Sequence, residues 1–108
     1  MRAYVRNKLG ELGITSKSYV LVKAKNGRLV EHKREDADDE ILLPEIWGIT
    51  MEMDDKIVAV IEYEPGEYGA KGMYYLRPKK GDRKNTISRH KLQRTAIAEF
   101  IRLRYNLA

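Results

Sequence analysis

The segment Lys56–Glu64 constrains the fold of this chain more than any other stretch. It reads KIVAVIEYE, with five consecutive apolar residues near its start. A strand that is apolar on both faces is normally a central strand, covered on both sides of its sheet. The preceding pair Asp54-Asp55 favours a tight turn, so residues 51–53 are expected to form the neighbouring strand. The chain is therefore expected to build an antiparallel sheet around this segment.

Two further strand signals lie on either side of this segment. Residues 18–33, SYVLVKAKNGRLVEHK, contain two strand-like runs joined by Asn26-Gly27, a dipeptide that suits a type I′ turn. Residues 73–77, MYYLR, predict a returning strand that Pro78 ends. Both signals add antiparallel neighbours to the central strand.

The stretch around the only tryptophan is less regular. Residues 41–43 predict a short strand that Pro44 ends, and residues 45–48 predict at most one helical turn. Trp47 is then expected to fill the core beside that turn.

Helices are expected at the two ends of the chain. Residues 2–12 carry apolar side chains at helical spacing, and Gly13 is suited to end that helix in a left-handed conformation. Residues 88–107 carry a longer apolar stripe, with Ser88 as the N-cap. The stripe consists of Leu92, Ala96, Phe100, Leu103 and Leu107, widened by Ile97 and Ile101.

These elements predict an α+β fold in a single domain over residues 1–108. Its small curved antiparallel β-sheet, or barrel-like meander, carries a short N-terminal helix and a longer C-terminal helix packed on it.

The composition excludes several classes of function. The chain has no cysteine, which rules out disulfides, cysteine nucleophiles and cysteine-ligated metal centres. No apolar run approaches the roughly 18 residues that a membrane-spanning helix needs, and the N-terminus is too polar for a signal peptide. A soluble cytoplasmic protein without a cofactor is expected. Charged residues make up 34% of the chain and glutamine occurs once, which is typical of thermophile proteins.

The charged residues are segregated along the chain. Residues 1–34 have a charge balance of +7, residues 35–67 of −11 and residues 68–108 of +9, in agreement with the net charge of +5. One interpretation is that the three segments neutralise one another inside the fold. The other is a basic face for a polyanion, with an acidic face that points elsewhere.

A proline-ended run, a Trp-Gly step, an acidic turn and a valine-rich strand follow one another between residues 41 and 78. The sequences ILLPEIWGI, MDDKIVAVIEYE and YYLRP carry this pattern, which resembles the AbrB/MazE swapped-hairpin family. In this resemblance residues 41–44 stand for a first strand, residues 45–49 for a short helix and residues 57–63 for a second strand. It implies an interlocked homodimer that binds DNA, such as a transcription regulator or an antitoxin.

The densest basic run of the chain, RPKKGDRKNTISRHKLQR, covers residues 77–94. Lysines and arginines where a loop meets a helix give sequence-independent contacts to phosphates. A final helix that opens with SRHK, after several strands, is similar to double-stranded RNA-binding domains. We therefore predict a small basic nucleic-acid-binding protein, of which a transcription regulator is one form. The predicted contact residues are Arg77, Lys79, Lys80, Arg83, Lys84, Arg89, His90, Lys91 and Arg94.

The alternative for this basic run is a solvated loop in front of a packing helix. Tyr68, Tyr74 and Tyr75 lie close to the run in sequence and are candidates for stacking on bases. Strand alternation is expected to bury either Tyr74 or Tyr75.

A non-enzymatic role is favoured, but two enzymatic alternatives stay open. His90 is a candidate general base for RNA cleavage, although a histidine among arginines more often contacts phosphate. Carboxylates at strand ends can hold Mg²⁺ for phosphodiester hydrolysis, in a layout loosely similar to PD-(D/E)XK nucleases. The candidate metal ligands are Asp38, Asp39, Glu62 and Glu64, for which solvated carboxylates on an exposed strand face are the simpler interpretation. A third hypothesis is a protein-interaction module whose acidic middle segment meets a basic partner.

Overall fold

The computed structural model describes residues 3–32, 44–67 and 70–105 of the chain. The helices are α1 (Ala3–Glu11) and α2 (Gln93–Tyr105), and a 3-10 turn covers Arg83–Asn85. The strands are β1 (Ser18–Lys23), β2 (Leu29–Glu31), β3 (Pro44–Met53), β4 (Lys56–Glu64), β5 (Met73–Arg77) and β6 (Ser88–His90). The predicted strands 56–64 and 73–77 are thus confirmed with their bounds.

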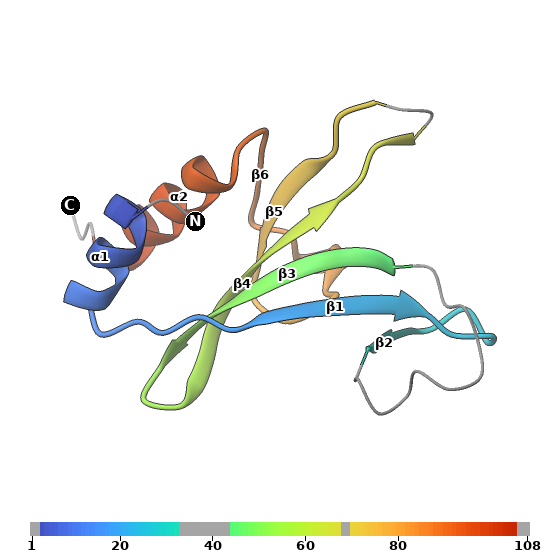
Figure 1. The fold of residues 1–108 in the computed structure, drawn as a ribbon, viewed down its shortest axis with the longest axis horizontal. Helices are drawn as coiled ribbons and strands as arrows, with labels where there is room; N and C mark the ends of the chain where they lie inside the picture. Colours follow the sequence, from blue (N-terminus) through green and yellow to red (C-terminus); the bar gives the residue numbers. More distant parts are fainter. Residues whose placement is uncertain (1–2, 33–43, 68–69, 106–108) are drawn as a thin grey trace.

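The architecture is α+β, as predicted. All strand pairs are antiparallel, and the six strands follow one another in the order β2-β1-β3-β4-β5-β6 (Figure 1). The sheet is open rather than barrel-like, because β2 and β6 lie at opposite edges. Within the described residues, neither helix is long and apolar enough to cross a membrane.

Helix α1 ends where the sequence predicts. Gly13 adopts a φ of 74°, and the amide of Ile14 donates to the carbonyl of Leu9 at 2.9 Å. Together with the bond from the Gly13 amide to the Gly10 carbonyl at 3.0 Å, this is a Schellman motif. The accompanying apolar contact is present too, since Leu9 and Ile14 share one core cluster.

Of the two hairpin turns, the one at Asp54-Asp55 agrees with the expectation and the one at Asn26-Gly27 does not. Asp54 and Asp55 both have positive φ, 52° and 61°, as a type I′ turn requires. In the loop 25–27 between β1 and β2 only Gly27 does, with a φ of 82°. That loop corresponds to the three-residue hairpin, in which an ordinary turn is followed by a left-handed glycine. The type I′ prediction for Asn26-Gly27 is therefore wrong.

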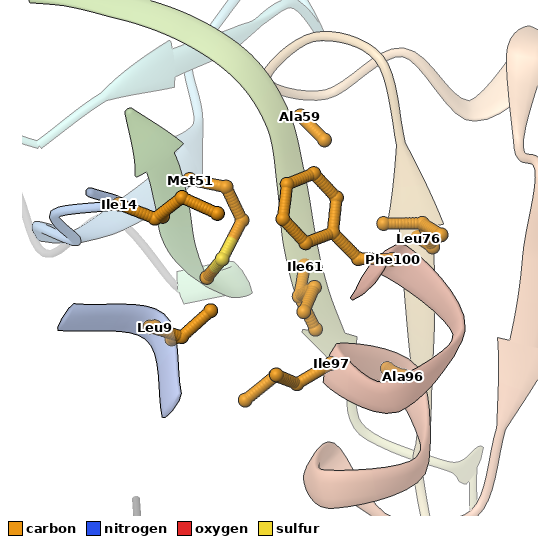
Figure 2. Packing of buried hydrophobic residues seen from close by; sticks show 9 residues of the cluster. All are labelled: Leu9, Ile14, Met51, Ala59, Ile61, Leu76, Ala96, Ile97 and Phe100. Carbon is orange, nitrogen blue, oxygen red and sulfur yellow. The ribbon is translucent and has the colours of Figure 1, made fainter. Parts of the chain in front are cut away.

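The two faces of the sheet are covered differently. On one face, here called the helix face, α1 and α2 lie side by side over one end of the sheet, and the strands extend beyond them (Figure 1). Figure 2 shows the core on that face, formed by Leu9, Ile14, Met51, Ala59, Ile61, Leu76, Ala96, Ile97 and Phe100. The opposite face, here called the loop face, carries a smaller cluster of Tyr19, Leu21, Ile46 and Val60 against which the loop 78–87 packs.

Residues 44–53 form one continuous strand, which corrects the predicted break and helical turn. Pro44 takes the first position of the strand, a place where its missing N–H is tolerated. Trp47 lies on the helix face and is 42% exposed, so it does not fill the core. The helix that the swapped-hairpin resemblance requires over residues 45–49 is thus replaced by a strand, and residues 41–43 lie outside the described residues.

The start of the last helix is also corrected. Ser88–His90 pair with β5 as an edge strand, and α2 begins only at Gln93, so Ser88 is no N-cap and the likeness to double-stranded RNA-binding domains is lost. The apolar stripe is narrower than predicted. Ala96, Ile97 and Phe100 are buried, Leu92 and Leu103 are exposed, and Leu107 lies outside the described residues.

Replacing Phe100→Ala is expected to lower the free energy of unfolding by about 3–5 kcal/mol, because the ring fills the space between α2 and the sheet. Leu103→Ala on the same helix is the matched control. Leu103 is 47% exposed, so its loss is expected to change stability by less than about 0.5 kcal/mol. Urea denaturation followed by circular dichroism measures both, and equal losses would contradict this orientation of α2.

Candidate nucleic-acid interface

The loop face is organised around the carboxylate of Glu62, which is 0% exposed. Tyr19, Gly48 and Glu62 lie directly opposite one another on β1, β3 and β4. Gly48 has no side chain, so the Tyr19 ring lies across it and the hydroxyl donates to Glu62 Oε2 at 2.5 Å. Burial raises the pKa of Tyr19, and its hydrogen bond to Glu62 and the charge of that carboxylate raise it further. The hydroxyl is therefore held in its donating, protonated form.

Arg77 on β5 neutralises this buried carboxylate. It donates from Nη1 to Glu62 Oε1 at 2.8 Å, from Nη2 to Glu64, and from Nε to Thr86 Oγ1 at 2.9 Å. Its guanidinium also lies over the Tyr75 ring, 4.5 Å from the centroid. Arg77 is only 2% exposed, so the prediction that it contacts phosphate is corrected: it is a structural residue.

The same carboxylate fastens the loop after β5 over the sheet. The amide of Gly81 donates to Glu62 Oε2 at 2.8 Å. Next to it, the Lys80 ammonium donates to Glu31 on β2 at 3.1 Å and lies 4.8 Å from the ring centroid of Tyr19. Lys80 therefore joins the loop to β1 and β2, and a phosphate would compete with Glu31 for it.

Glu64 is held by two arginines. Its Oε1 accepts hydrogen bonds from Arg83 Nε at 3.0 Å and Nη2 at 2.7 Å, and its Oε2 accepts from Arg77. Arg83 Nη2 also lies 3.5 Å from Glu45 Oε2. Burial alone would raise the pKa of Glu64, but the hydrogen bonds from Arg83 and Arg77, with their charges, outweigh it and lower that pKa. Arg83 is thus partnered, like Lys80.

Of the four candidate metal ligands, Glu62 and Glu64 are described, and both have carboxylates that are hydrogen-bonded within the fold. All four oxygens of Glu62 and Glu64 accept hydrogen bonds from the chain, and Glu62 is buried rather than solvated. Asp38 and Asp39 lie outside the described residues, as does the rest of the acidic stretch 35–40. The described ranges contain no group of three or more His, Asp or Glu that could hold a metal ion.

The other predicted phosphate contacts remain at the surface. Five of them are exposed and form no ion pair with any residue in the described part of the chain. They follow the loop, the edge strand β6 and the start of α2, and are Lys79, Lys84, Arg89, Lys91 and Arg94. His90 is half-buried, with its Nε2 2.7 Å from Ser88 Oγ.

A row of ring-bearing side chains crosses the helix face and ends on β6, the edge strand that also carries Arg89. Trp47, Tyr63, Tyr74 and His90 lie directly opposite one another on β3, β4, β5 and β6. The ring centroids of Trp47 and Tyr63 are 6.3 Å apart, and those of Tyr63 and Tyr74 are 4.9 Å apart. Sequence reasoning missed this row, because it exists only through the registers of three strand pairs.

The three tyrosines that are candidates for stacking on bases, Tyr68, Tyr74 and Tyr75, do not lie together on one face in the described structure. Tyr74 belongs to this row, whereas Tyr75 points to the loop face, where Arg77 covers it. Both are half-buried, so the expected burial of one of them is not observed. Tyr68 lies outside the described residues.

Replacing Gly48→Ala is expected to destabilise the fold by about 1–3 kcal/mol, because the new methyl group would overpack the loop face. A Cβ at this position would lie 2.2 Å from Tyr19 Cζ, so the ring would have to leave Glu62. Gly10→Ala is the control: it lies in α1 with nothing within 4 Å of the added Cβ, and about 1 kcal/mol of stabilisation is expected. Thermal unfolding compares the stability of the two variants. A Gly48→Ala variant as stable as the wild type would contradict the position of the Tyr19 ring across Gly48.

Acid is expected to weaken the fold through Glu64. Its pKa is lower in the folded chain, so its stabilising contribution is present above the unfolded value of about 4.3 and is lost as the pH falls through the folded value. Glu64→Gln should therefore flatten the fall in unfolding free energy below about pH 5, measured by urea denaturation at several pH values. Glu67→Gln should keep the wild-type slope, because Glu67 is exposed and forms no ion pair with any residue that the structure describes. An unchanged slope in Glu64→Gln would refute the role of the two arginines.

Comparison of the chain with protein-family models, with curated proteins and with solved structures found no match.

Proposed function

We propose that this protein binds nucleic acid through the basic residues around β6. The observation that carries the proposal is the set of five exposed cations between residues 79 and 94 without an acidic partner in the described ranges. Cations of this kind attract the phosphate backbone and release its counterions, whatever the base sequence.

The ion pairs of the remaining basic residues in the run 77–94 support the choice of these five cations. The loop face uses Arg77, Lys80 and Arg83 to neutralise glutamates of β2, β3 and β4. The neutralisation interpretation therefore holds for the loop face, and we assign the polyanion interpretation to the cations around β6. Part of the third segment neutralises the acidic middle, and the cations that remain are those available to a polyanion.

The surroundings of His90 support binding rather than catalysis. Its Nε2 is engaged with the hydroxyl of Ser88, as in a nucleophile and base pair. Such a pair also needs a group that orients the other ring nitrogen, and no described residue forms a hydrogen bond there.

The double variant Arg89→Glu/Lys91→Glu is expected to weaken the binding of a short oligonucleotide. Each phosphate contact that is lost should also reduce the slope of log affinity against log salt by about 1. Fluorescence anisotropy of a labelled oligonucleotide, recorded from about 50 mM salt upward, measures both quantities.

Lys17→Glu/Lys56→Glu is the matched control, because it reverses two exposed lysines outside the basic run. It changes the net charge equally and should leave most of the affinity intact. The proposal would be contradicted if the wild type did not bind at about 50 mM salt. It would also be contradicted if both double variants lost the same amount of affinity.

A further inference from the structure

The row formed by Trp47, Tyr63 and Tyr74 borders a groove on the helix face. The groove has a volume of about 270 Å³, and Val20 and Gln93 also line it. Trp47 is 42% exposed, which is unusual for the only tryptophan of a small domain, since this residue normally contributes to the core. Tyr63 and Tyr74 are half-buried. Helices α1 and α2 cover only one end of this face, and the sheet extends beyond them (Figure 1).

The groove is lined by aromatic, apolar and uncharged polar residues, and its aromatic row leads to the edge strand β6, which carries basic residues. None of the described residues that line it is acidic. Its aromatic row continues into His90 on the edge strand, and Lys91 follows His90 in the sequence. Arg89 lies opposite Tyr75 and so points to the loop face at the same edge of the sheet. Gln93 stands at the start of α2, and no described residue forms a hydrogen bond with its side-chain amide, which can both donate and accept.

We infer that this row binds the unpaired bases of a single-stranded nucleic acid, with the phosphates on the cations at the β6 edge. The inference rests on the proposed function and names its ligand class. Aromatic rings on neighbouring strands of an open sheet can each stack with a base, and cations at the border hold the backbone. In a duplex the bases are already stacked on one another and their faces are closed to side chains. The row therefore selects single strands.

Trp47 makes the inference directly measurable, because it is the only tryptophan of the chain. Titration with a short single-stranded oligonucleotide is expected to quench its fluorescence, in parallel with the anisotropy of a labelled strand. A duplex of the same sequence should give weaker binding and little quenching, and a neutral oligosaccharide should give none. Equal quenching by the duplex, or quenching by the oligosaccharide alone, would overturn the inference.

Variants of the row give a second measurement. Tyr74→Leu is expected to weaken single-strand binding by about 5- to 150-fold, the range for the loss of one stacked base, whereas Tyr74→Phe keeps the ring and should restore most of the affinity. Trp47→Ala tests the row at its most exposed member and should give a loss in the same range. Ile57→Ala, an exposed apolar residue outside the row, is the control with unchanged affinity.

The outcomes separate this inference from the proposed function. Single strands that bind in a manner sensitive to Arg89→Glu/Lys91→Glu, but without quenching of Trp47 and without an effect of Tyr74→Leu or Trp47→Ala, would overturn the stacking role and leave phosphate binding in place. Absence of any binding at about 50 mM salt would overturn both.

Discussion

The buried ion pair between Glu62 and Arg77 is the interaction on which the rest of the structure depends. Removing two charges from water costs several kcal/mol per ion, and this cost is offset only where hydrogen bonds satisfy the remaining donors and acceptors. Tyr19, Gly81 and Thr86 complete that set here, and no buried side-chain nitrogen or oxygen of the described residues lacks a partner. Because these partners come from β1 and from the loop after β5, the pair specifies which segments meet on the loop face. We interpret the ion pair as a determinant of which segments pack together rather than as a source of net stability. Loss of either residue would leave an unpaired charge buried.

This ion pair also explains how a chain of segregated charges folds without burying them unpaired. The glutamates of β4 come from the acidic middle segment, and the arginines that neutralise them come from the basic third segment. Antiparallel pairing of β4 with β5 brings the two segments into register, with Glu62 opposite Tyr75 and Val60 opposite Arg77. The neutralisation is local to the loop face. The exposed cations near β6 form no ion pair with those glutamates, so their charges are not neutralised in this way.

Local chemistry made part of this structure predictable. The apolar run of β4, the glycine after α1 and the turn at Asp54-Asp55 each depend on neighbouring residues only, and all were assigned correctly. The predictions for Pro44 and Ser88 are wrong because both residues lie in strands that pair with other strands of the sheet. This pairing outweighs their usual roles as a strand end and a helix N-cap. Arg77 looked like one more cation of a basic run. Its burial follows from its place on β5, beside two glutamates spaced i, i+2 on one face of β4, and that spacing was the one available signal.

The four residues Ile61 to Glu64 show why the two faces have separate roles. Successive side chains of a strand point to opposite faces, so Glu62 and Glu64 turn to the loop face while Ile61 and Tyr63 turn to the helix face. Ile61 lies in the core under the helices, and Tyr63 lies one step farther along, in the aromatic row. A shift of one residue in this register would turn both carboxylates to the helix face and Tyr63 to the loop face, and each would lose the partners that it has here. The same alternation therefore places the hydrogen-bonded carboxylates on the loop face and the aromatic row on the helix face, beyond the end that α1 and α2 cover.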